Sequence, residues 1–364
     1  MRLGTILRIL SVVALLAVPV SAQQPDGLQA GRVELQSAGA LTFGPEGILF
    51  VGDSIGAAVY AIDTSDSTVG PAGHVSIQGI NARIAAMTGT VPDQILINDM
   101  AVNPISKNVY LSVSRGTGPD AIPLVLRVQG DGTIEELALS NVRHSSVRLM
   151  NPPAPGTGRA ARTRLESITD MAFAHGRLFI AGLSNEEFSS KLRAVPFPFK
   201  SATDGTSVEI FHGNHGRLET NSPVRTFVPY DIDNEPHILA AYTCTPLVTF
   251  PVEDLKPGRK VLGRTIAELG NRNRPLDMII YSKDGSDHIL MSNNSRGVMK
   301  MSAEGLKGYE HIGSPLADEA TAGVPYETLD LSGVEQLDQL DGERAVVMIR
   351  ASAGSVDLQT IALP

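Results

Sequence analysis

The chain has 364 residues, of which 42% are hydrophobic and 19% charged, and its formal net charge is −9. These proportions exclude a wholly disordered chain and allow one large core. Nucleic acid is not expected as a partner, because the negative charge repels phosphate backbones and the aromatic content of 5% leaves few stacking side chains. The 35 Gly and 23 Pro predict many short strands joined by turns.

The start of the chain has the pattern of an export signal. Arg2 and Arg8 are followed by an apolar run over residues 11–20 and by small residues at the cleavage positions, which end at Ala22. We therefore expect a cleaved signal peptide over residues 1–22 and a single domain over residues 23–364, with an uncleaved membrane anchor as the alternative. The mature protein is expected to be secreted or periplasmic and to have no membrane contact after cleavage.

One pattern recurs six times along the rest of the chain. It consists of a short apolar strand, a turn, a stronger apolar strand, a polar turn and a third strand, and its period is about 59 residues. A period of this length with about four strands per repeat predicts an all-β fold, a six-bladed β-propeller with four-stranded blades. The equivalent inner-strand positions are Phe43, Met100, Met171, Phe227, Met278 and Leu337.

The ends of the chain predict how the ring closes. The sixth repeat has only three strands, the last over residues 356–363, whereas residues 32–36 alternate polar and apolar ahead of the first repeat. We predict that this N-terminal strand joins the C-terminal blade and completes it. The alternative is two separate β domains divided near the loop at residues 151–158.

Polar residues recur where inner strands begin and where second strands turn into third strands. Both positions are expected at one face of the propeller, around the mouth of its channel. Carboxylate and amide oxygens are the ligands that Ca²⁺ requires, which predicts a Ca²⁺ site at this face. An equally open interpretation is that each aspartate accepts backbone N–H groups in its own turn. The predicted metal ligands are Asn98, Asp99, Asp170, Asp277 and Asn293.

Four arginines, Arg115, Arg274, Arg296 and Arg350, are expected at a similar height. Guanidinium groups bind carboxylates and phosphates in bidentate fashion, so a small anionic ligand is one interpretation. The other is that these arginines form ion pairs with the aspartates.

The single cysteine and a histidine pair are expected to be structural. Cys244 is interpreted as a small buried side chain, because no histidine partner for a nucleophile can be named. His212 and His215 have metal-ligand spacing but lie in a Gly-rich stretch with no third ligand nearby, which favours a surface loop.

Residues 44–53, Gly-Pro-Glu-Gly-Ile-Leu-Phe-Val-Gly-Asp, resemble the blade pattern of the six-bladed gluconolactonase and paraoxonase families and, more loosely, of NHL-repeat proteins. The resemblance implies a channel Ca²⁺ that polarises a lactone or ester carbonyl. Asn98 and Asp99 are similar to the Asn-Asp ligand pair of these families. The sequence departs from them at Thr42, where these lactonases have a glutamate.

The leading hypothesis is therefore a metal-dependent hydrolase of a small lactone or ester. Its expected catalytic residues are Asp99 or Asp170, which would orient water, and Arg115 or Arg274, which would hold a substrate carboxylate.

Two alternatives belong to other functional classes. A non-catalytic propeller would bind a protein or a small extracellular ligand, with an exposed apolar patch around Phe188, Tyr242 and Pro246. A quinone-dependent oxidoreductase is the third hypothesis.

Overall fold

The protein is described by a computed structural model over residues 27–70, 73–202, 204–244, 246–351 and 354–364. The predicted export signal lies outside these residues. Among the described residues, no helix combines the length and the hydrophobicity needed to cross a membrane.

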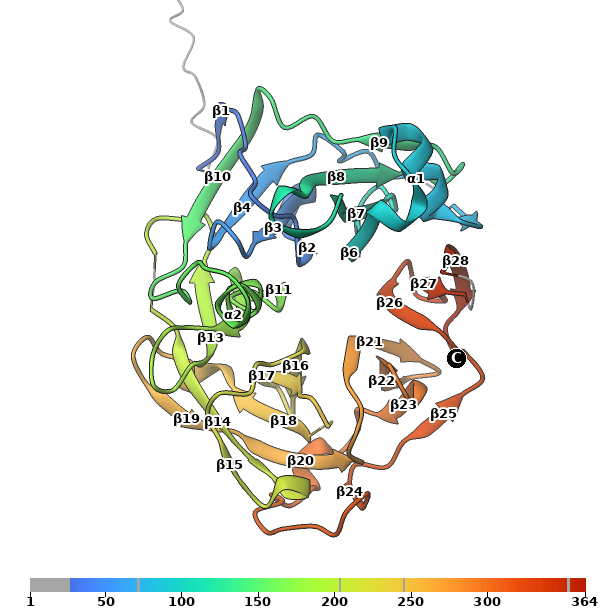
Figure 1. Ribbon diagram of the computed structural model, residues 1–364. Coiled ribbons are helices and arrows are strands. Elements are labelled where there is room, and N and C mark those ends of the chain that lie inside the picture. Colours follow the sequence, from blue (N-terminus) through green and yellow to red (C-terminus); the bar gives the residue numbers. More distant parts are fainter. Residues whose placement is uncertain (1–26, 71–72, 203, 245, 352–353) are drawn as a thin grey trace, which may run out of the picture.

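Six β-sheets are arranged radially around one axis, which confirms the predicted six-bladed propeller (Figure 1). We number the blades by the order of their inner strands. From the inner strand outward, blade 1 contains β2 (Leu41–Phe43), β3 (Ile48–Asp53), β4 (Ala58–Asp63), β10 (Val142–Arg148) and β1 (Gln29–Gly31). Blade 2 contains β6 (Ile95–Val102), β7 (Val109–Arg115), β8 (Ile122–Val128) and β9 (Ile134–Glu136). Blade 3 contains β11 (Asp170–Ala174), β12 (Arg177–Leu183), β13 (Ser190–Pro196), β14 (Thr206–His212) and β15 (Arg217–Glu219), with β19 (Lys260–Leu262) parallel to β14.

The other three blades have the same antiparallel order. Blade 4 contains β16 (Thr226–Ile232), β17 (Glu235–Ala241), β18 (Pro246–Pro251), β20 (Arg264–Leu269) and β24 (Thr321–Gly323). Blade 5 contains β21 (Pro275–Lys283), β22 (Ser286–Asn293), β23 (Gly297–Ser302) and β25 (Glu327–Leu329). Blade 6 contains β26 (Val334–Gln339), β27 (Arg344–Arg350), β28 (Val356–Ala362) and β5 (Ser76–Ile77). The first and second strands predicted for all six repeats are therefore confirmed.

The blades do not follow one another around the ring in sequence order. The inner strand β2 contacts both β6 and β11, and β6 also contacts β26. The order around the axis is therefore blade 2, 1, 3, 4, 5, 6, as the colours of Figure 1 show. This order arises because the chain leaves blade 1 after β4, adds β5 to blade 6, passes through helix α1 (Ile80–Thr88) into blade 2, and only then returns to blade 1 as β10.

The ring is closed by a different segment from the one predicted. Blade 6 is completed by β5, in which Ile77 pairs with Leu358 of β28. Residues 32–36 form no strand, and β1 just before them pairs with β10 at the outer edge of blade 1. The physical reason is burial, because Ile77 is 1% exposed and can fill the apolar space between blades 6 and 2, whereas residues 32–36 alternate in exposure.

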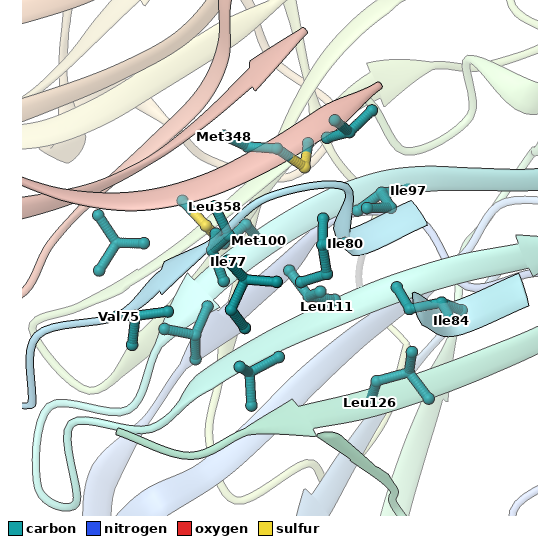
Figure 2. Close-up of a cluster of buried hydrophobic side chains, with 14 of the residues drawn as sticks. Val75, Ile77, Ile80, Ile84, Ile97, Met100, Leu111, Leu126, Met348 and Leu358 are labelled. Carbon is teal, nitrogen blue, oxygen red and sulfur yellow. The ribbon is translucent and has the colours of Figure 1, made fainter. Parts of the chain in front are cut away.

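Figure 2 shows the apolar cluster at this closure. Val75 and Ile77 come from the segment around β5, Met348 and Leu358 from blade 6, and Met100 from blade 2. Helix α1 adds further aliphatic side chains to the same cluster. Closure therefore buries apolar surface from three parts of the chain in one place, which stabilises the ring by the hydrophobic effect.

Candidate functional site: the central channel

One repeat position of each inner strand carries a polar residue. Across the six blades its residues are Thr42, Asp99, Asp170, Thr226, Asp277 and Gln336. Five of the six line a channel cavity of about 130 Å³, together with Ala40, Asn98, Thr169, Arg225, Arg274, Pro275 and Leu276.

A β-bulge directs three of these side chains. The pairing of inner and second strands skips one residue immediately before Asp99, Asp277 and Gln336. A bulge bends its strand and redirects the next side chain, so local backbone geometry repeated in three blades converges polar groups on the channel.

Each of the three channel aspartates, and Asp338 in blade 6, ties two blades together. Asp99 shows the pattern: its Oδ1 accepts the N–H of Met100 at 2.8 Å, and its Oδ2 accepts the N–H of Leu41 in blade 1 at 2.6 Å. The same two-sided bonding, at 2.7 to 2.8 Å, joins Asp170 to Met171 and Phe227, Asp277 to Met278 and Leu337, and Asp338 to Gln339 and Val102. The aspartates therefore accept backbone N–H groups, as the structural interpretation predicted, but from inner strands and not within a turn of their own, and half of these bonds cross to a neighbouring blade.

The pKa values of the three channel aspartates are raised. Burial raises the pKa of Asp170 to about 7. Burial also holds the pKa values of Asp99 and Asp277 well above the ordinary range, and the nearby negative charge of Asp170 raises both further. In its hydrogen-bonding orientation, the Gln336 amide donates to Asp99 Oδ1 at 2.7 Å and to Asp277 Oδ2 at 3.1 Å. Burial and repulsion between the carboxylates therefore favour protonation or a bound cation at this end of the cavity.

Arginines provide the positive side of the same cavity. Arg274 lines it as predicted, and Arg225, which the sequence analysis did not select, lies in the lining beside it. Arg225 Nη1 donates to Glu166 Oε1 at 2.8 Å. Burial, followed by repulsion from Arg225, lowers the pKa of Arg274. The position of Arg225, just before Thr226, matches that of Asn98 before Asp99, which is the signal that could have identified it.

Two of the predicted site residues lie outside the cavity lining. Arg115 Nη1 donates to the carbonyl of Thr88 at 3.0 Å, at the end of helix α1. Asn293 is the buried last residue of β22, where its amide donates to Asn273 at 2.9 Å and its oxygen accepts the N–H of Ser295. The structure therefore gathers Asn98, Asp99, Asp170, Asp277 and Arg274 around the channel, without the other two.

The predicted apolar patch for a protein partner does not form. Tyr242 is 1% exposed and Pro246 is buried. The ring of Phe188 is covered by Lys260, whose Nζ lies 3.4 Å from the ring centre. Tyr242 instead packs in the apolar cluster between blades 3 and 4.

A larger hollow lies next to the channel residues. Its volume is about 520 Å³, and Glu166, which pairs with Arg225 of the channel, is part of its wall. Helix α2 (Arg159–Leu165) contributes Arg159 and Arg162 to the same wall. The hollow thus offers two further guanidinium groups beside the channel cavity.

No family model and no curated protein match the sequence. Among solved structures, the periplasmic gluconolactonase of Pseudomonas aeruginosa is similar at 12% identity and a TM-score of 0.34, covering 90% of this chain and 89% of the other. The PQQ-bound aldose sugar dehydrogenase of Streptomyces coelicolor is similar at 12% identity and a TM-score of 0.32, covering 93% and 99%. The plexin A4 extracellular region is similar at 9% identity and a TM-score of 0.41, covering 92% of this chain but only 46% of the plexin chain, so this chain spans less than half of that structure.

Proposed function

We propose that the protein is an exported hydrolase that uses its channel cavity to cleave a small lactone or ester with the help of a hard divalent cation, Ca²⁺. The observation that carries the proposal is the convergence of three half-buried aspartates of raised pKa and two arginines on one cavity. Export is supported by the signal-like pattern at the start of the sequence.

The donor chemistry of the cavity suits Ca²⁺, which takes six to eight oxygen ligands. The amide nitrogen of Asn98 already donates to Ala38 and Ser114, so its oxygen is the atom it can offer to a ligand. Within the described residues, the three carboxylates do not bring oxygens within 4.8 Å of one another as a group. A cation held here would draw its ligands from the channel aspartates and the Asn98 oxygen.

The residues that line the cavity have separate roles in the proposed reaction. A bound Ca²⁺ would supply Lewis acidity toward the carbonyl. Asp170 would orient the attacking water, and Arg274 with Arg225 would bind a carboxylate on the substrate. The channel cavity is smaller than usual ligand pockets of roughly 300–1,000 Å³, so the body of the substrate would lie in the adjoining hollow near Arg162.

Calorimetric titration with Ca²⁺, melting with and without chelator, and a panel of lactones and esters test this proposal. We expect stoichiometric binding, a higher Tm with Ca²⁺ and chelator-sensitive turnover, because a ligand that binds only the native state stabilises it. Asp277→Asn should reduce all three effects, whereas Asp131→Asn, at an exposed turn, should not. Absence of both Ca²⁺ binding and turnover in the wild type would contradict the proposal.

A second candidate function is non-catalytic binding of a small anion. It is favoured by the observation that both oxygens of each channel aspartate already accept backbone N–H groups, which gives them a complete structural role. In that case the 520 Å³ hollow would be the binding site, and Arg162→Ala would weaken binding of an anionic ligand without altering any response to Ca²⁺.

A further inference from the structure

Blades 3 and 4 meet at a group of three metal-ligating side chains, His212, His215 and Cys244, which we call the histidine–cysteine cluster. His212 ends β14, His215 ends the 3-10 turn Gly213–His215, and Cys244 lies in the turn between β17 and β18. One ligand atom from each residue lies within 4.8 Å of the other two. In the described part of the chain, no other group of three His, Cys, Asp or Glu residues has this geometry.

Only His215 lies on the surface loop that the Gly-rich sequence predicted for the pair, because His212 is buried. His212 is 1% exposed, and neither of its ring nitrogens makes a hydrogen bond. Burying an imidazole without a well-aligned hydrogen bond costs free energy, and such groups in native proteins call for an explanation such as an ion. The missing third ligand is Cys244, which comes from the next blade and is therefore distant in sequence.

Glu219 orients both imidazole rings. Its Oε1 lies 2.6 Å from His215 Nδ1, and its Oε2 lies 3.2 Å from His212 Nδ1, although the second contact lacks the alignment of a hydrogen bond. The ring centres of the two histidines are 3.7 Å apart. A carboxylate at Nδ1 is the usual support of a metal-binding histidine, and it leaves each Nε2 as the ligand atom.

A fourth donor stands next to the cluster. Glu268 is fully buried, and its Oε2 lies 4.0 Å from His212 Nε2. Its other oxygen accepts the N–H of Gly213 at 2.5 Å, which fixes the carboxylate beside the histidine turn.

We propose that His212, His215 and Cys244, with Glu268 as fourth donor, form a site for a transition-metal ion of the Zn²⁺ class. A thiolate and two imidazoles are ligands for such borderline ions and not for Ca²⁺. Tetrahedral bond lengths place neighbouring ligand atoms roughly 3.3–3.6 Å apart, a spacing that side-chain atoms already within 4.8 Å of one another can reach by small movements. The bound ion would join blade 3 to blade 4.

Co²⁺ and Zn²⁺ titrations of the full chain, kept reduced and freed of metal, test the site. We expect one Co²⁺ per chain with a thiolate-to-metal absorption band, displaced by Zn²⁺ and unaffected by excess Ca²⁺. Cys244→Ser should abolish the band, and Glu219→Gln should weaken Zn²⁺ affinity about 10–100-fold. Zn²⁺ should also raise the Tm of the wild type.

His215→Asn is the variant least able to disturb folding, because the side chain of His215 is 40% exposed. It should lower Zn²⁺ affinity while the Tm of the metal-free protein stays near that of the wild type. His175→Gln, which alters a histidine paired with Asp231 on the surface, is the matched control and should bind Zn²⁺ normally. Wild-type protein that binds no Co²⁺, or a Cys244→Ser variant that retains the band, would overturn the proposal.

Discussion

The carboxylate of Asp338 accepts the backbone N–H of Val102 at 2.7 Å, and this bond joins blade 6 to blade 2 across 236 residues of sequence. The other Asp338 oxygen accepts the N–H of Gln339. A single side chain thus satisfies one donor in each of two blades at the closure of the ring. Comparable bonds from Asp99, Asp170 and Asp277 tie other blade pairs.

Removing this tie should destabilise the ring. Asp338→Ala leaves two inner-strand N–H groups without their acceptor, and an unsatisfied buried donor costs about 1–3 kcal/mol. We expect the free energy of unfolding to fall by about 2 kcal/mol or more in urea denaturation. Asp93→Ala, at an exposed position of a 3-10 turn, should change it by less than about 0.5 kcal/mol. Equal stability of the two variants would show that the tie contributes nothing.

Acidification should stabilise the cation-free protein in a defined pH window. Burial raises the pKa of Asp170 to about 7 and that of Asp338 to about 6, above the ordinary value of 3.8. The folded state therefore binds protons more tightly than the unfolded state, and stability is lost as pH rises through these values. We expect the Tm to increase by roughly 2–4 °C when pH falls from 7.5 to 5.5.

The same measurement has an internal control at lower pH. A hydrogen bond from Lys191 lowers the pKa of Glu186, so its contribution to stability is lost when pH falls below the ordinary carboxyl range. The profile of Tm against pH should therefore pass through a maximum on the acid side of neutrality. Asp170→Asn should reduce the decrease of Tm above the pH of the maximum and leave the decrease below it unchanged. An unchanged decrease above the maximum in this variant would refute the assignment of that pH dependence to Asp170.

Arg274 and Arg115 form a matched pair for testing the anion-binding role of the channel. Arg274 lines the cavity, whereas Arg115 donates to Thr88 at the end of α1. Arg274→Ala should raise the KM for an anionic substrate, or the Kd of an anionic ligand, by about tenfold or more, because a charge-assisted hydrogen bond contributes about 1.5–3 kcal/mol. Arg115→Ala should leave ligand affinity unchanged, and a similar loss in both variants would indicate an effect through folding.

The closure of the ring by β5 can be tested at its buried side chain. Ile77→Ala removes aliphatic volume from the cluster of Figure 2 and should lower the free energy of unfolding by about 2–5 kcal/mol. Val69→Ala, in the same connecting segment but 82% exposed, is the control and should have little effect. Limited proteolysis near residue 77 should become faster in Ile77→Ala alone, whereas identical cleavage of wild type and variant would argue against closure by this strand.

The six-fold repeat was determined by the sequence alone. Local patterns decide where apolar strands alternate with Gly- and Pro-rich turns, so each first and second strand could be predicted from its own repeat. The aspartates at equivalent repeat positions were visible for the same reason, and Asp99, Asp170 and Asp277 do converge on the channel.

Tertiary structure alone decided the order of the blades, the closing strand and the partners of the aspartates. The strand β5 has only two residues, too few to carry a periodic signal, and its place is set by the apolar space between blades 6 and 2. The histidine–cysteine cluster was hidden for a related reason: His212 and Cys244 belong to different blades, and only the packing of one blade against the next brings an imidazole and a thiol together. Contacts between blades depend on the whole ring, which no local pattern of residues encodes.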